Sequence, residues 1–113
     1  MFDLITIGDT VIDTYLPIDD AQILEEDGVK YLGLKYGLKI PVEEGVSVVA
    51  GNAANNAIGA SRLKLKTAIY TNVGNLDDDE ADDRIRAKIN KEGVDTRLIV
   101  ENKDLPSGHH IVL

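Results

Sequence analysis

The chain has 113 residues, of which 43% are hydrophobic and 28% are charged, and this composition is typical of one small globular domain. It contains no cysteine, which excludes a disulfide scaffold and a cysteine-based zinc site. The net charge of −8 argues against binding to nucleic-acid phosphates. No apolar run suits a membrane span or a signal peptide, so we expect a cytoplasmic protein.

The first half of the chain is predicted to be mainly extended. Residues 3–8 (DLITIG) form an apolar run that ends at a glycine, which is typical of a buried parallel strand. Residues 10–18 are rich in β-branched and apolar side chains and predict a second extended segment. We expect one or two helical turns in residues 19–27, and short strands joined by turns in residues 29–49.

The second half is predicted to alternate between helices and strands. Residues 52–63 are mostly small and predict a helix whose backbone can approach a sheet closely. A strand is expected at 65–73, a helix at 79–91, a strand at 97–100, and the start of another strand at 109–113. This alternation predicts an α/β fold with parallel strands and right-handed crossovers.

The helix at 79–91 has the clearest pattern. Acidic residues crowd its start and basic residues follow, which matches the helix dipole. Ala81, Ile85 and Ile89 recur every four residues and would face the core, and Gly93 is well placed to end the helix. The acidic start lacks the glycine and glutamate spacing of a calcium-binding loop, so no calcium site is predicted.

Two features could bind a ligand with hydroxyl groups. Gly51 precedes a predicted helix start, where free N–H groups attract oxygen atoms, and Asn52 and Asn55 add amide groups that suit sugar hydroxyls. Asp13 lies within an apolar extended segment, and its carboxylate could accept two sugar hydroxyls. A tightly packed helix start and a solvated strand carboxylate explain the same residues without a ligand, and both alternatives remain open.

Several other site types find no support in the sequence. His109 and His110 are adjacent in a predicted strand, so they should face opposite ways and cannot chelate one metal together. The phosphate-binding loop and dinucleotide-binding glycine motifs are absent from the sequence. No metal site is therefore predicted.

Taken together, the motifs resemble the start of the pfkB/ribokinase family of carbohydrate kinases. The resemblance rests on the segments ITIGDTVID, AGNAANNA, KEGVDTRLIV and PSGHHIVL, and on Gly74, where the family's N-terminal signature ends. Two departures stand out, Lys64 where the signature has glycine or serine, and a longer turn at 75–83.

The resemblance implies an α/β, ribokinase-like fold with a parallel central sheet flanked by helices and a small β-lid. Residues 1–113 would form a single partial domain, the N-terminal substrate-side part, with lid strands around 10–18, 38–49 and 108–113. The residues that match substrate-contacting positions of the family are Asp13, Gly51, Asn52 and Asn55.

The implied activity is phosphoryl transfer from ATP to a hydroxyl of a sugar or nucleoside, with Mg²⁺ neutralising phosphate charge. The family's catalytic aspartate motif, G-[AG]-G-D, does not occur in this sequence, so we expect no catalytic residue and no ATP site in this chain. The apolar end HHIVL suggests a longer natural protein.

Expected partners are a homodimer mate at the lid strands or a complementing C-terminal part, with no nucleic acid and no membrane. A non-catalytic sugar-binding or assembly module of the same ancestry, or a small α/β interaction protein whose resemblance is only ancestral, remains an alternative.

Overall fold

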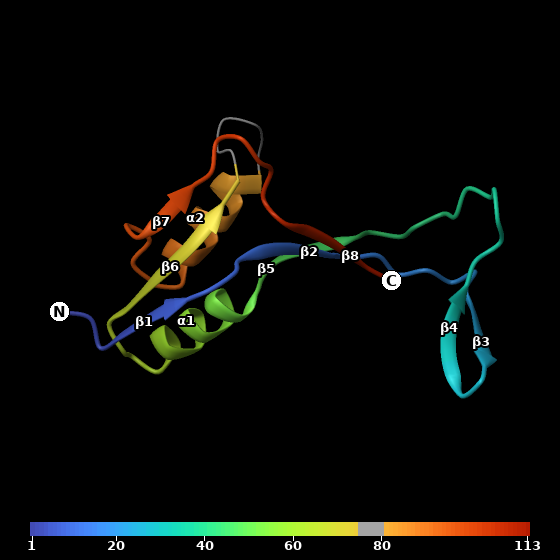
Figure 1. Ribbon diagram of the computed structural model, residues 1–113, viewed down its shortest axis with the longest axis horizontal. Coiled ribbons are helices and arrows are strands. Elements are labelled where there is room, and N and C mark those ends of the chain that lie inside the picture. The colour runs from blue at the N-terminus through green and yellow to red at the C-terminus, as the bar shows by residue number, and fades with distance from the viewer. Residues whose placement is uncertain (75–80) are drawn as a thin grey trace.

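The central layer of the molecule is a sheet of three parallel strands. The computed structural model describes residues 1–74 and 81–113. Strands β1 (Leu4–Ile7), β6 (Thr67–Val73) and β7 (Ile99–Glu101) pair in the order β1-β6-β7, and every pair is parallel (Figure 1). The parallel sheet predicted from the sequence is therefore confirmed.

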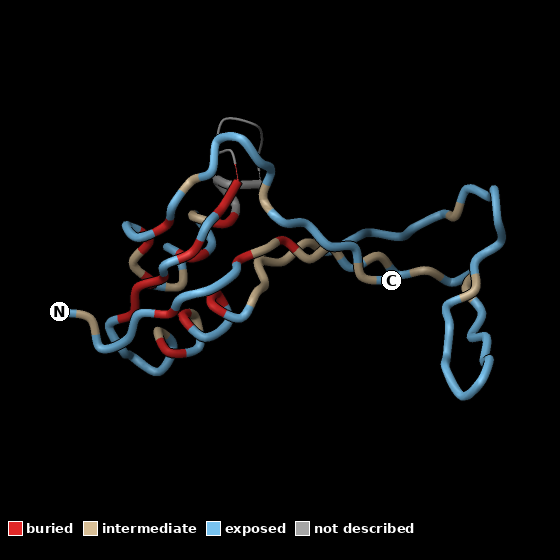
Figure 2. The backbone as a smooth tube through the Cα atoms, in the orientation of Figure 1, coloured by how far each residue is buried: buried red, intermediate tan, exposed pale blue. Residues whose placement is uncertain are grey.

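Two helices cover one face of this sheet. Helix α1 (Asn52–Arg62) packs closely on β1 and β6 because its inward residues are alanines, and the Thr6 hydroxyl donates to the Ala53 carbonyl at 3.0 Å. Helix α2 (Ala81–Lys91) contributes two fully buried isoleucines to the same core. Figure 2 shows the buried residues on the strands and helices of the main body, whereas the hairpin extension is exposed. The core consists of Ile12, Ala53, Ala54, Ala57, Ile69, Val73, Ile85, Ile89, Val94 and Ile99.

The opposite face of the central sheet is exposed in the described part of the chain. Because side chains alternate across a strand, Ile7 pairs with Tyr70 on the face away from the helices. Ile7 is 74% exposed and Ile5, Tyr70 and Val100 are each more than 40% exposed. We call these four residues the open face. An uncovered apolar sheet face of this kind usually marks a contact surface.

A second sheet extends from the first. It has the order β5-β2-β8, with β2 (Val11–Tyr15) antiparallel to β5 (Val46–Ala50) and parallel to β8 (His109–Val112). Strands therefore lie within residues 10–18 and 108–113, as predicted. The predicted strand at 38–49 is mostly wrong, since only its last residues belong to β5. Pro41, which lacks an N–H, and two adjacent glutamates make the preceding stretch a poor strand.

The helical turns predicted for residues 19–27 are wrong, because this segment belongs to a β-hairpin. Strand β3 (Gln22–Glu26) is antiparallel to β4 (Val29–Gly33). The two residues between them, Asp27 and Gly28, have φ angles of 51° and 77°. Two-residue hairpin turns favour Asp-Gly for this backbone conformation, and that dipeptide was the overlooked signal.

The turn that follows α1 contains a left-handed residue that is not a glycine. Lys64 has a φ angle of 71°, and its N–H donates to the Ser61 carbonyl at 2.8 Å. This is the position where the sequence departs from the family signature. Neither described helix is long and apolar enough to cross a membrane.

We expect Lys64→Gly to raise the free energy of unfolding by about 0.5–1 kcal/mol, because glycine adopts this conformation without steric cost. Urea denaturation followed by circular dichroism measures the change. Lys64→Ala is the control, since it removes the same side chain and keeps the strained conformation. Equal stability of the two variants would contradict the explanation.

Candidate functional site

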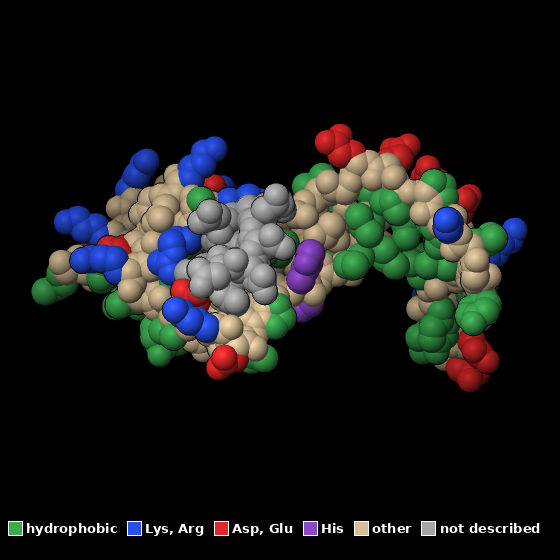
Figure 3. Space-filling view, turned by 90° about the horizontal axis from the view of Figure 1, so that it is seen from above, with side chains coloured by type: hydrophobic (Ala, Val, Ile, Leu, Met, Phe, Trp, Pro, Cys, Tyr) green, Lys and Arg blue, Asp and Glu red, His purple; other side chains and the backbone are tan. Residues whose placement is uncertain are grey.

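Asp13 lies on the central strand of the second sheet, between two paired strands. Its register partners are Val48 on β5 and His110 on β8. The Asp13 Oδ1 atom lies 3.1 Å from Nδ1 of His110, and the two side chains are 20% and 64% exposed. In Figure 3 the histidines lie where the main body meets the extension that carries the hairpin. Asp13 is thus partly shielded but still accessible to a ligand.

Gly51 places the start of α1 against the segment that leads into β2. Its φ angle is 102°, and a Cβ atom there would lie 2.6 Å from the carbonyl oxygen of Asp9 and 3.0 Å from Cα of Thr10. The first N–H groups of a helix lack intrahelical partners. At the start of α1 no side chain caps them either. Asn52 and Asn55 are exposed on that turn.

The register between β2 and β5 determines how far apart these two features lie. Val11 pairs with Ala50, the residue directly before Gly51. Asp13 lies two residues further along β2, which is about 7 Å. The structure therefore brings the start of β2 and the start of α1 together. The contact it describes for the Asp13 side chain is with His110, and the two asparagines are not part of it.

The other face of the second sheet has its own polar cluster. The Thr14 hydroxyl lies 2.8 Å from the Ser47 hydroxyl and 2.7 Å from Nε2 of His109. These contacts join all three strands. His109 and His110 thus face opposite ways, as predicted. Over the residues that the structure describes, no group of three or more histidine or acidic side chains could hold a metal ion.

The sequence analysis overlooked His110 as a site residue. Its contact with Asp13 depends on parallel pairing between strands 97 residues apart in the chain. Alternation within one strand cannot predict which other strand pairs with it, so no local signal identified this residue.

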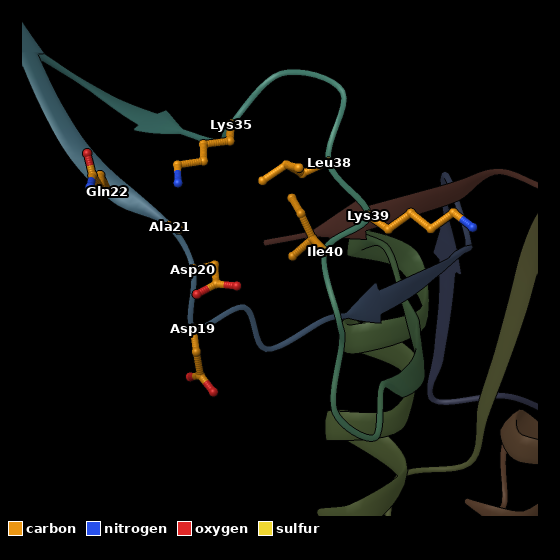
Figure 4. A pocket seen from close by; sticks show the side chains of 8 residues that line it. All are labelled: Asp19, Asp20, Ala21, Gln22, Lys35, Leu38, Lys39 and Ile40. Carbon is orange, nitrogen blue, oxygen red and sulfur yellow. The ribbon is translucent and has the colours of Figure 1, made fainter.

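A pocket of about 320 Å³ lies near the base of the hairpin, away from Asp13. Figure 4 shows Asp20, Lys35, Leu38 and Ile40 pointing toward its centre, whereas Lys39 points away. None of the predicted site residues lines this pocket. Its charged groups are exposed and of both signs, which suits a solvated surface hollow better than a selective site.

Two exposed ion pairs lie at the opposite end of the molecule's main body from Gly51. A hydrogen bond from Arg62, at the end of α1, lowers the pKa of the Glu92 carboxyl. A hydrogen bond from Arg97 likewise lowers the pKa of the Asp95 carboxyl, next to the start of β6. The first pair joins the ends of α1 and α2, and the second lies within the loop between α2 and β7.

The sequence matches the pfkB family of carbohydrate kinases over residues 1–113. No curated protein matches it.

Solved structures of sugar kinases have the same fold. A ribokinase from Arabidopsis thaliana, complexed with ribose and ATP, superimposes with a TM-score of 0.75 at 21% identity, over 98% of this chain and 31% of that one. A fructokinase from Xylella fastidiosa gives 0.66 at 21%, over 97% and 28%. A sugar kinase from Pyrococcus horikoshii in complex with ATP gives 0.64 at 29%, over 94% and 29%. The chain therefore spans about a third of the length of these relatives.

Proposed function

Because this chain belongs to the pfkB family of carbohydrate kinases, we propose that it is the N-terminal part of an ATP-dependent sugar kinase and that it holds the sugar. The observation that supports this most is the Asp13 carboxylate. Asp13 is partly buried on β2, the central strand of the second sheet, and the first residues of β2 lie against the start of α1. A carboxylate held in this way is well suited to bind hydroxyl groups.

Each proposed contact has a distinct role. Asp13 would accept hydrogen bonds from two sugar hydroxyls. Asn52 and Asn55 would add amide donors and acceptors from the first turn of α1, where unpaired N–H groups also favour oxygen atoms. Gly51 would keep this turn close to β2, because its lack of a side chain permits the contact with Asp9 and Thr10.

The rest of the reaction is proposed to depend on residues outside this chain. The phosphoryl group would come from ATP, which is bound in the structures from Arabidopsis thaliana and Pyrococcus horikoshii. Mg²⁺ would neutralise the phosphate charge, but the described residues offer no cluster to hold it. The role of this chain is then to bind and orient the sugar. The open face supports this division, since the remainder of such a domain could cover it.

Asp13→Ala is expected to raise the KM for the sugar about 10- to 100-fold, because it removes an ionised hydrogen-bond acceptor from the site. The measurement is steady-state kinetics with the longest natural form of the protein, using ribose, fructose and adenosine as acceptors. The KM for ATP should change less than threefold. Asp20→Ala is the matched control, because Asp20 is a carboxylate on the same extension that lines the separate pocket.

Two outcomes would contradict the proposal. An unchanged sugar KM in Asp13→Ala would remove Asp13 from the site. Sugar binding by calorimetry without any phosphoryl transfer would instead favour a non-catalytic sugar-binding module.

A further inference from the structure

The contact between Asp13 and His110 gives the proposed site a second polar side chain. Parallel pairing of β2 with β8 places the two residues side by side on one face of the sheet. Their carboxylate and imidazole groups meet at 3.1 Å, and most of the imidazole remains exposed. A ligand that reaches Asp13 must therefore also lie beside His110.

The chemistry of the two groups determines which atoms they offer. An ionised carboxylate only accepts hydrogen bonds, so the Nδ1 atom of His110 must carry the proton and donate to Asp13. In a neutral imidazole, the other nitrogen, Nε2, then accepts. The Asp13 Oδ2 atom also remains available as an acceptor. The pair thus presents two acceptors on neighbouring strands. Neighbouring strands of a sheet lie about 5 Å apart.

The strand positions beside the pair carry no charged side chain. Besides His110, the strand positions on the same face as Asp13 are Val11 and Tyr15 on β2, Val46, Val48 and Ala50 on β5, and Val112 on β8. No lysine or arginine occupies a position on this face of β2, β5 or β8. Two acceptors with no cation on these strand positions suit neighbouring hydroxyls of a neutral ligand, and they disfavour an acidic one.

We propose that His110 contacts the substrate directly and that, with Asp13, it selects two adjacent hydroxyls of a neutral sugar. This inference rests on the proposed function, in which Asp13 binds the sugar. It extends that function, because it assigns a specificity role to a residue on the last strand of the chain.

The test compares His110→Ala with His109→Ala. His109 is the adjacent histidine, and it faces the opposite side of the sheet, where it bonds to Thr14. Binding of ribose, fructose and adenosine is measured by calorimetry on the longest natural form of the protein. Binding of the monodeoxy analogues of the tightest of these ligands is then measured in the same way. Gluconate is measured as the example of an acidic ligand.

We expect His110→Ala to weaken binding of the tightest neutral sugar about 3- to 10-fold, and His109→Ala to leave it unchanged. One monodeoxy analogue should bind the unmodified protein 3- to 10-fold more weakly than the parent sugar. This analogue should bind His110→Ala as tightly as it binds the unmodified protein, because removing the hydroxyl and removing the imidazole eliminate the same hydrogen bond. Gluconate should bind more weakly than the neutral sugar.

The outcomes separate this inference from the proposed function. If Asp13→Ala abolishes binding but His110→Ala binds every analogue like the unmodified protein, His110 is not a contact and only the present inference is overturned. If gluconate binds more tightly than all neutral sugars, the selection of a neutral ligand is overturned. If no sugar binds, or Asp13→Ala has no effect, both the proposed function and this inference are overturned.

Discussion

Gly51→Ala is expected to lower the free energy of unfolding by about 2–4 kcal/mol. Two costs combine. The φ angle of 102° is one that residues with a side chain rarely adopt. The new Cβ would also lie 2.6 Å from the Asp9 carbonyl oxygen, and since the obstructing atoms belong to the backbone they cannot rotate away.

Gly59→Ala is the control for this prediction. Gly59 lies within α1, and apart from its chain neighbours and the backbone of its own helix no atom lies within 4 Å of the position its Cβ would take. Alanine there should stabilise the protein by about 0.5–1 kcal/mol through its higher helix propensity. Denaturation followed by circular dichroism should thus give opposite signs for the two glycine-to-alanine changes. The same sign and size for both would contradict the assigned role of Gly51.

The sequence was sufficient to predict those elements whose residues carry a local pattern. The run of small residues in α1 and the apolar runs of β1 and β6 predicted a helix packed on a parallel sheet. The hairpin was missed because residues 19–27 were interpreted as helical turns, whereas Asp27 and Gly28 determine the turn between the strands. Turn chemistry outweighed a weak helical pattern there.

In the candidate site, too, residues with a local sequence pattern could be predicted and the others could not. Asp13 could be selected because a carboxylate within an apolar strand is unusual, and Gly51 because it precedes a helix of small residues. His110 could not be selected, because its place in the site depends on the pairing of β8 with β2. Long-range pairing of this kind is set by the whole fold, and no short segment encodes it.

Ile7→Lys is expected to have little effect on stability in the 113-residue chain and a large effect in a longer form of the protein. In the 113-residue chain, Ile7 is 74% exposed, so the free energy of unfolding should change by no more than about 0.5 kcal/mol. In a longer form that contains the remainder of a sugar kinase domain, the open face would be covered. A lysine buried there without a partner should cost about 3–5 kcal/mol.

Leu63→Lys provides the control, because Leu63 is 78% exposed at the end of α1, on the helical side of the sheet. It should change stability little in either form. A large loss for Ile7→Lys in the longer form alone would identify the open face as the surface that the rest of the domain covers. An equally small change in both forms would contradict that arrangement, and the apolar side chains of β1 and β6 would then need a different partner, such as a second copy of the chain.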